Sequence, residues 1–174
     1  MTEFRRSRRF CGACTAEMID APGLPARRCP ACDQFEWASP IAAALVVVWR
    51  RAGGRREALL VRHTYQHQDT WALVGGLLDP AETVEQTARR EVGEEVGLEV
   101  GELTYVGSEH WGLNGPNMLL SVFTAEVLDA RAEPRVDGRE IAEARFFPVD
   151  ALPANRIPDY PITGRALVHL RDLG

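Results

Sequence analysis

Three carboxylates fall within five residues of this 174-residue chain, at Glu91, Glu94 and Glu95. Residues three and four apart share a face of a helix, so the three side chains point the same way. That face overlaps the edge of an apolar stripe formed by Val84, Ala88, Val92 and Val96. Carboxylates turned toward the protein body need a compensating cation, and oxygen ligands suit Mg²⁺ or Mn²⁺. The spacing therefore favours a divalent-cation site over a solvated helix face.

The residues around this helix indicate how it is placed. Gly75 and Gly76 permit a backbone turn that side chains would block, and they can present a carbonyl to a metal. Two capping registers are open at the helix start, one at Asp79-Pro80 and one at Thr83. Gly97 supplies a left-handed residue where the helix ends. We therefore expect a glycine-rich turn followed by a capped helix that carries the glutamates.

A second candidate metal site lies near the N-terminus. The chain has four cysteines, and their C-x2-C-x14-C-x2-C spacing is close to that of paired zinc knuckles: Cys11, Cys14, Cys29 and Cys32. Four thiolates complete the tetrahedral coordination of Zn²⁺, so the predicted zinc is structural. Two disulfides fit poorly with a chain that shows no secretion signal, and a redox pair explains only half of the cysteines. Structural zinc is therefore the preferred interpretation.

Composition and charge restrict the function further. The net charge is −5, which gives no general reason to bind nucleic acid. All 20 basic residues are arginine, so lysine-dependent chemistry, including Schiff bases and the P-loop, is excluded. No apolar run is long enough to span a membrane, and the first ten residues lack the apolar stretch of a signal peptide. We expect a cytoplasmic protein with no membrane partner.

The pattern of elements predicts a zinc ribbon over residues 1–38 and a catalytic domain over 39–174. Six strands are predicted in the second part, at 41–49, 58–62, 71–74, 103–108, 118–127 and 144–149. The glutamate helix lies between the third and fourth strands, and an amphipathic helix is predicted at 163–173. This order is typical of an α/β protein, more strictly α+β, with a mixed sheet between helices.

One segment resembles a known family motif. Nine positions over 23 residues match the Nudix box completely: Gly76, Glu82, Arg90-Glu91-Val92, Glu94-Glu95 and Gly97-Leu98. The resemblance implies a Nudix α/β/α sandwich and a hydrolase that acts on phosphoanhydride bonds. It also implies that Glu91, Glu94 and Glu95 bind Mg²⁺ or Mn²⁺ and that Gly76 contributes its carbonyl. Arg90 would hold the glutamates in place, with support from Glu82 at the helix start.

The general base is expected outside the box. The resemblance places a glutamate just before the last strand at the metal site, and Glu140 matches that position best, with Glu143 second. Both could instead be solvated loop acids. Trp111 is a candidate for stacking on a base, with core packing as its alternative role, and Arg62 is a further candidate substrate contact. The loop histidines, such as His63 and His67, are expected to be surface residues.

The ribbon points toward a substrate class. A four-cysteine ribbon before a Nudix domain resembles the NADH pyrophosphatases and some ADP-ribose and FAD pyrophosphatases. Leu77 departs from the aromatic residue that the NADH enzymes use for stacking, and Asn114 departs from a proline frequent in the ADP-ribose class. The expected reaction is metal-dependent cleavage of the diphosphate in a nucleoside diphosphate linked to another group.

Two alternatives remain open at the sequence level. One is a pyrophosphatase that removes damaged nucleoside triphosphates. The other is a nucleotide-sensing regulator that uses the ribbon to bind DNA or protein, although such regulators tend to lose box residues and this box is complete. A packing or dimerisation module is the favoured role of the ribbon, so the expected partners are a nucleotide substrate and a second copy in a homodimer, without nucleic acid.

Overall fold

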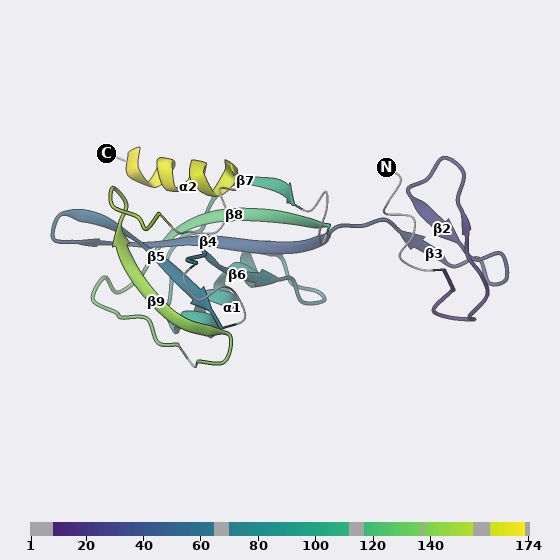
Figure 1. Cartoon of the computed structure of the whole chain (residues 1–174), viewed down its shortest axis with the longest axis horizontal. Coiled ribbons are helices and arrows are strands. Elements are labelled where there is room, and N and C mark those ends of the chain that lie inside the picture. The colour runs from purple at the N-terminus through teal and green to yellow at the C-terminus, as the bar shows by residue number, and fades with distance from the viewer. Residues whose placement is uncertain (1–8, 65–69, 112–116, 137, 155–160, 173–174) are drawn as a thin grey trace. The chain divides into compact units, whose positions relative to one another are not determined.

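The computed structural model describes residues 9–64, 70–111, 117–136, 138–154 and 161–172. The chain divides into two compact units, Met1–Pro40 and Ile41–Gly174, and each is described by itself. Figure 1 labels their helices and strands. The boundary falls two residues after the predicted end of the ribbon.

The first unit is a small antiparallel sheet with a cysteine-lined interior. Its three strands pair in the order β1-β2-β3, with β1 at Ile19–Asp20, β2 at Ala26–Arg28 and β3 at Phe35–Trp37. Its buried apolar cluster consists of Cys11, Met18 and Cys29, with Ala16 packed against it. So small an apolar cluster supplies little hydrophobic stabilisation, and a bound metal would have to add to it.

The second unit is built on a mixed sheet. Its strands run in the order β7-β8-β4-β5-β9, and β6 pairs with β4 beside this path. The β4–β8 pair is parallel, and the other strand pairs are antiparallel. The bounds are β4 Ile41–Ala52, β5 Arg55–His63, β6 Val74–Leu77, β7 Thr104–Trp111, β8 Met118–Glu126 and β9 Ile141–Pro148. The expected mixed α+β architecture is confirmed.

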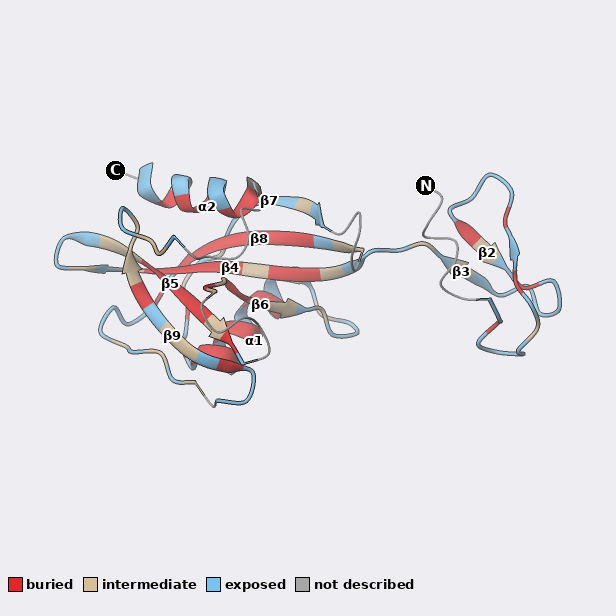
Figure 2. Ribbon diagram, in the orientation of Figure 1, coloured by how far each residue is buried: buried red, intermediate tan, exposed pale blue. Residues whose placement is uncertain are grey.

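Each face of the sheet packs against one helix. Helix α1 (Val84–Val96) buries Ala88, Val92 and Val96 in a core with the inward side chains of β4 and β5. Helix α2 (Pro161–Asp172) buries its apolar side chains against the opposite face, in a core that contains Val47, Leu60 and Trp71. Figure 2 shows the buried stretches of β4, β5 and β8 between the two helices. The sheet therefore holds α1 and its glutamates on one side.

Local sequence signals set the start and end of α1. Thr83 is the N-cap, and its side chain and that of Gln86 form a reciprocal capping box, so the second of the two predicted registers is the one adopted. Gly97 ends the helix in the left-handed conformation, with φ 63°. The start at Val84 and the end at Val96 place the glutamates in the last two turns.

One predicted turn is shorter than expected. The segment 50–57 was expected to be a polar turn, but β4 continues to Ala52 and β5 begins at Arg55. Gly53 and Gly54 alone make the connection, with φ 57° and 77°, as a tight hairpin requires. Arg50 and Glu57 pair across the two strands at 2.8 Å, which extends the ladder into polar sequence.

In the described part of the chain, no helix is both long enough and apolar enough to span a membrane.

Candidate active site

The glutamates of α1 divide into two buried side chains and one exposed one. Glu91 and Glu95 are 9% and 7% exposed, whereas the side chain of Glu94 is 62% exposed. Glu91 and Glu95 lie on the edge of the helix that faces β6, in agreement with the overlap of the acidic face and the apolar stripe. Two carboxylates in such positions need partners.

Arg90 is the main partner of these carboxylates. Its Nη1 lies 2.8 Å from a carboxylate oxygen of Glu91 and 3.0 Å from one of Glu94. Its Nε lies 2.9 Å from Glu82, and its Nη2 donates to the carbonyl of Leu77 at 3.1 Å. One guanidinium therefore ties the helix to the loop before it, the arrangement expected from the sequence for Arg90 and Glu82.

The glycines of β6 bring the backbone against the acidic side chains. The N–H of Gly75 donates to Glu95 at 3.1 Å. A Cβ atom on Gly76 would lie 2.2 Å from a carboxylate oxygen of Glu91, and one on Gly75 would lie 2.1 Å from the carbonyl oxygen of Ala44. Gly75 has no room for a side chain, because the backbone of β4 occupies the space, and a side chain at Gly76 would displace the Glu91 carboxylate from its position.

A fourth carboxylate joins the cluster from the loop before β9. A cavity of about 210 Å³ is lined by the three box glutamates and by Arg139, Glu140 and Ile141. Thr64, which follows β5, holds this loop: its N–H donates to the carbonyl of Glu140 at 2.9 Å and its hydroxyl to that of Arg139 at 2.7 Å. The structure thus places Glu140 beside the box glutamates.

Glu143 and Arg62 are directed elsewhere. Glu143 lies on β9 opposite Arg62 of β5, and the two side chains form an ion pair. Glu143 also accepts from Arg145 at 2.8 Å, while the Arg62 guanidinium lies 5.2 Å from the centre of the Trp71 ring. Of the two base candidates, therefore, Glu140 lines the cavity and Glu143 does not. Arg62 contacts these neighbours on the sheet.

The two candidate contacts for a base, Leu77 and Trp111, lie in different parts of the structure. Leu77 ends β6 directly after Gly76, and its side chain is 51% exposed. Trp111 ends β7, and strand alternation places it on the same face as Glu109, which accepts from the N–H of Ile162 in α2. Leu77 therefore borders the box, whereas Trp111 lies on the α2 face of the sheet. Asn114 and His67 lie outside the described residues.

The electrostatics of the cavity favour a bound cation. Burial raises the pKa of Glu95 to about 8, opposed by the hydrogen bond from Gly75 and assisted by the charges of Glu91 and Glu140. Burial also raises the pKa of Glu91, although Arg90 opposes the shift. A divalent cation would reduce the repulsion among these carboxylates, because it would neutralise their negative charges. The donor set, all oxygen, fits Mg²⁺ or Mn²⁺.

One residue near the site was missed by the sequence analysis. His63 was expected to be a surface residue of a loop, but it ends β5 and is only 9% exposed. Burial lowers its pKa, opposed by the charge of Glu140. Strand alternation could have predicted this burial, because Leu59 and Val61 are buried on the same face of β5.

The four cysteines of the first unit form one compact cluster. Their sulfur atoms lie within 4.8 Å of one another, and the measured Sγ–Sγ distances are 3.4, 3.5 and 3.6 Å. These distances exceed a disulfide bond of about 2.05 Å and approach the ~3.8 Å edge of a tetrahedron with Zn–S bonds of about 2.3 Å. All four are free thiols. The cluster therefore fits a metal and not the disulfide alternative.

One cysteine of this cluster, Cys29, has a lowered pKa. Burial raises the pKa of Cys29, but hydrogen bonds from the backbone N–H groups of Ala31 and Cys32 bring it down to about 7. Thiolate is the form that binds metal, so this backbone arrangement favours ligation at neutral pH.

Comparison with known proteins agrees with this geometry. The family model of the NUDIX domain matches residues 39–167. The chain belongs to the NUDIX domain family. The match includes the box, the loop of Glu140 and the sheet that holds them, so the resemblance seen in the sequence is confirmed.

Curated relatives extend the similarity of this NUDIX chain into the cysteine unit. It is 37% identical over 153 residues to a protein of Deinococcus radiodurans called NAD-capped RNA hydrolase NudC, covering 88% of this chain and 53% of that protein. A protein of the same name from Chromobacterium violaceum is 34% identical over 172 residues, covering 99% of this chain and 62% of that protein. The chain thus spans between about half and two thirds of the length of these relatives.

Solved structures show the same fold. A NUDIX hydrolase from Nitrosomonas europaea has a TM-score of 0.70 at 24% identity, covering 95% of this chain and 92% of that one. The NUDIX domain of NrtR from Shewanella oneidensis, solved with ADP ribose, has a TM-score of 0.63 at 16% identity, covering 76% and 89%. At these identities the comparison concerns the fold alone.

Proposed function

We propose that this protein is a Mg²⁺- or Mn²⁺-dependent pyrophosphohydrolase that cleaves the diphosphate of a nucleoside diphosphate linked to another moiety. The observation that carries this proposal is the cavity lined together by Glu91, Glu94, Glu95 and Glu140. Four carboxylates around about 210 Å³ suit divalent cations that in turn hold a diphosphate.

Each residue has a part in this reaction. Glu91, Glu94 and Glu95 would hold the metal, which supplies charge neutralisation of the diphosphate, and the carbonyl of Gly76 would join them. Arg90 keeps the glutamates in position through its ion pairs. Glu140, which lines the same cavity, accepts the proton of the attacking water, since no ion pair with another described residue engages it. The products are two phosphomonoesters.

The preferred substrate class is a dinucleotide of the NAD type, ahead of ADP-ribose and FAD. Two curated relatives are named NAD-capped RNA hydrolases, and NAD contains the expected diphosphate between two nucleosides. Leu77, exposed beside Gly76, would contact one of these nucleosides, whereas a contact from Trp111 or Arg62 would have to come from the α2 face.

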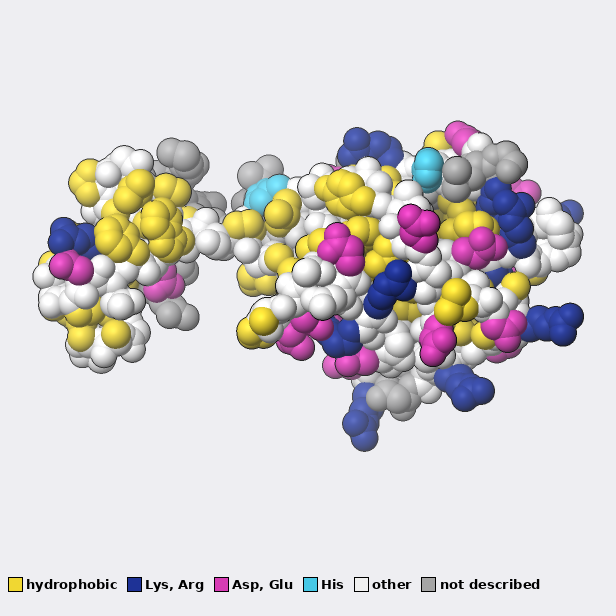
Figure 3. All heavy atoms as spheres, turned by 180° about the vertical axis from the view of Figure 1, so that it is seen from behind, with side chains coloured by type: hydrophobic (Ala, Val, Ile, Leu, Met, Phe, Trp, Pro, Cys, Tyr) yellow, Lys and Arg dark blue, Asp and Glu magenta, His cyan; other side chains and the backbone are white. Residues whose placement is uncertain are grey.

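The charges of the described residues are mixed in sign. Figure 3 shows one face of the molecule, on which arginine side chains of the second unit are interspersed with acidic ones. In the first unit, Arg9, Arg27 and Arg28 each pair with a nearby carboxylate. A small dinucleotide is therefore the simpler substrate.

A substrate panel tests this proposal. The full chain, with Mg²⁺ or Mn²⁺, is incubated with NADH, NAD⁺, ADP-ribose, FAD and a nucleoside triphosphate, and nucleoside monophosphates are measured. We expect release of AMP from NADH or NAD⁺ with the highest kcat/KM. Preference for the triphosphate would support the alternative function of a pyrophosphatase that removes damaged nucleoside triphosphates. Metal-dependent binding with no hydrolysis of any substrate would support a nucleotide-sensing regulator.

We further propose that the four cysteines hold one structural zinc. The fit rests on their sulfur distances and on the lowered pKa of Cys29. Elemental analysis should return about one zinc per chain, since four thiolates complete one tetrahedral site. A folded ribbon without metal would contradict the proposal. Dimer formation through the ribbon and a cytoplasmic location stay predictions.

A further inference from the structure

A second hollow lies on the sheet, apart from the carboxylate cavity. It is a groove of about 470 Å³ at the ends of β4 and β8 and the start of β7, and it shares none of its lining residues with the carboxylate cavity. Trp49, Thr104 and Thr124 contribute side chains from three adjacent strands. Trp49 belongs to the core on the α2 face of the sheet, so the groove opens on that face.

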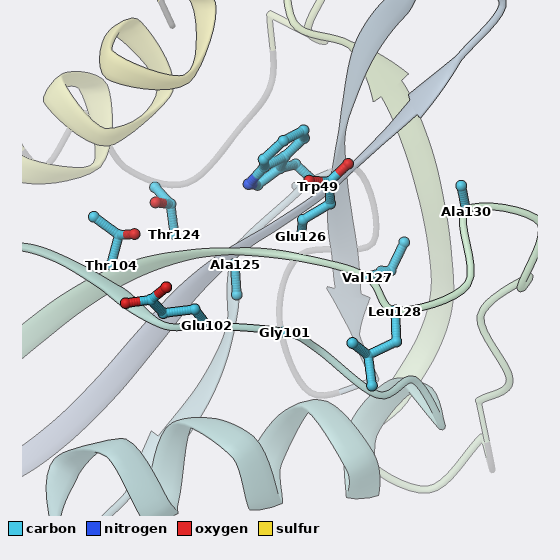
Figure 4. Close-up of a pocket in the computed structure, with 10 residues that line it drawn as sticks. All are labelled: Trp49, Gly101, Glu102, Thr104, Thr124, Ala125, Glu126, Val127, Leu128 and Ala130. Carbon is cyan, nitrogen blue, oxygen red and sulfur yellow. The ribbon is translucent and has the colours of Figure 1, made fainter.

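Polar atoms of well-buried side chains are turned into this groove. Trp49 is 9% exposed and Thr124 is 3% exposed. Among the described residues, no hydrogen bond to the indole N–H of Trp49 or to the hydroxyl of Thr124 is present, and neither atom belongs to the fully buried polar atoms without a partner. Figure 4 shows the indole nitrogen turned toward the side of the groove where Thr104 and Thr124 lie. Both polar groups are therefore open to the groove, where they can bond to water or to a ligand.

The ring of Trp49 is fixed in this orientation. The guanidinium groups of Arg51 and Arg56 lie 5.8 and 5.7 Å from its centroid. Arg56 also donates to the carbonyl of Leu170 in α2 at 3.2 Å, so its position is set by the fold. The N–H edge of the indole is therefore presented to the groove by packing and not by chance rotation.

The rim of the groove is acidic. Glu102 and Glu126 line it, and its other lining residues are uncharged: Trp49, Gly101, Thr104, Thr124, Ala125, Val127, Leu128 and Ala130. The lining offers two carboxylates and no basic side chain to a phosphate, although Arg51 and Arg56 lie against the ring of Trp49, and it shares no residue with the carboxylate cavity. Two carboxylates are also too few for a Ca²⁺ site built from protein ligands, which takes about six to eight oxygen atoms.

A cationic organic molecule satisfies all of these groups. An ammonium or guanidinium group can donate to Glu102 and Glu126, and a carbonyl or hydroxyl of the same molecule can accept from the Trp49 N–H. Leu128, 67% exposed, offers apolar surface for a short alkyl chain. The volume also falls within the range of small-molecule sites, about 300–1,000 Å³.

We propose that this groove binds a small organic cation, an alkylammonium or guanidinium compound that also carries a hydrogen-bond acceptor. The proposal does not depend on the hydrolase activity, because it uses none of the residues of the carboxylate cavity.

The indole N–H signals of the ¹⁵N-labelled full chain test this proposal. The chain has four tryptophans, and Trp49→Phe assigns the signal of Trp49. The probe is N-acetylputrescine, which has an ammonium group and an amide carbonyl. The control probe is N-butylacetamide, which has the same acetamide group and four-carbon chain but no ammonium group. We expect N-acetylputrescine to shift the Trp49 signal saturably and N-butylacetamide to leave it in place.

Two double variants test whether Glu102 and Glu126 bind the ammonium group of the probe. Glu102→Gln/Glu126→Gln should weaken N-acetylputrescine binding on the order of tenfold, the sum of two exposed ion pairs. Glu85→Gln/Asp150→Asn removes two exposed carboxylates elsewhere and should leave the affinity unchanged. No shift of the Trp49 signal at millimolar probe, equal binding of the neutral probe, or equal weakening by both double variants would overturn the proposal.

Discussion

At the scale of single residues, the charge of Glu95 depends on its surroundings. It is 7% exposed, it accepts one hydrogen bond from Gly75, and the negative charges of Glu91 and Glu140 act on it. Among the described residues, Arg90 forms ion pairs with Glu82, Glu91 and Glu94 but not with Glu95. Glu95 is therefore the box glutamate whose ionisation most needs a bound cation.

The raised pKa of Glu95 predicts how stability changes with pH. The folded protein keeps a proton on Glu95 up to a pKa of about 8, whereas the unfolded chain loses it near the ordinary value of 4.5. The folded state therefore binds more protons between pH 5 and 8, and the free energy of unfolding falls as the pH rises. Thermal melts without added Mg²⁺ should show a Tm that decreases over this range.

Two controls make this prediction specific. Glu95→Gln removes the titrating group, so its Tm should change less between pH 5 and 8. Mg²⁺ competes with the proton, so it should raise the Tm of the wild type more at pH 8 than at pH 6. The pKa of Glu82, lowered to about 2 by Arg90, titrates below this window and does not interfere. His63, whose pKa burial lowers, acts with the opposite sign below its ordinary pKa of 6.5, so the comparison with Glu95→Gln decides. A wild-type Tm that rises from pH 5 to 8 relative to the Tm of Glu95→Gln would show that the assigned shift has the wrong sign.

Thr64 predicts an effect on catalysis from outside the cavity. Its hydroxyl and N–H hold the carbonyls of Arg139 and Glu140, so it positions Glu140 through the backbone. Thr64→Val removes the hydroxyl bond and should lower kcat by about 10- to 100-fold with KM nearly unchanged, because misplacement of a base affects the chemical step. Thr64→Ser keeps the hydroxyl and should retain most of kcat. Equal losses in the two variants would point to general destabilisation instead.

At the scale of elements, α1 was the part most readily predicted. Its apolar stripe, its capping box and its terminal Gly97 are all local signals, and the structure follows them. The distinction between Glu140 and Glu143 was not local. It depends on the register of β9 with β5, which shifts beside Arg62 and His63 and pairs Glu143 with Arg62. Sequence spacing alone carries no information on such a shift.

The capping box predicts a measurable share of stability. Thr83 accepts from the N–H of Gln86, and the Gln86 side chain accepts from the N–H of Thr83. Thr83→Ala should lower the free energy of unfolding by about 1 kcal/mol, because it leaves a helix donor without a partner. Denaturant unfolding measures this change, and Thr83→Ser, which keeps the cap, serves as the control. A loss of similar size in Thr83→Ser would argue against the cap.

Strand alternation could have been used more fully at this scale. It places His63 in the buried row of β5 and Trp111 on the α2 face of β7, and both facts follow from counting residues once the strand limits are known. The limits themselves were uncertain by several residues, since β5 and β7 end inside polar sequence. Because the predicted strand ends were wrong, the expected surroundings of His63 and Trp111 were wrong as well.

At the scale of the whole molecule, the chain combines two units with different sources of stability. The unit Ile41–Gly174 has a core on each face of its sheet, whereas in the described part of the unit Met1–Pro40 the buried apolar side chains beside the cysteines are Met18, Ala21 and Ala26. Cysteine spacing predicted the first unit and the box predicted the second, because both motifs are short-range. The role of the ribbon is not encoded in such motifs.

This difference predicts a selective effect of metal removal. A strong chelator should unfold the ribbon, because its folding free energy depends on metal binding, and should leave the sheet of the second unit folded. Hydrogen exchange of the full chain measures both units at once: protection should be lost at Met18 and Cys29 and kept at Val47 and Leu60. Cys29→Ser should give the same pattern without chelator, and retained protection at Met18 would contradict it.

The central claim is that the carboxylates of α1 and the loop before β9 perform metal-dependent hydrolysis of a diphosphate. Its most direct test is the turnover of NADH by Glu95→Gln, with Mg²⁺ and with Glu85→Gln as a matched control on the exposed face of the same helix. We predict a loss of kcat of at least about 100-fold for Glu95→Gln, because a lost metal ligand removes the charge stabilisation of the transition state, and near wild-type turnover for the control. Turnover of Glu95→Gln within a few-fold of the wild type would contradict the account.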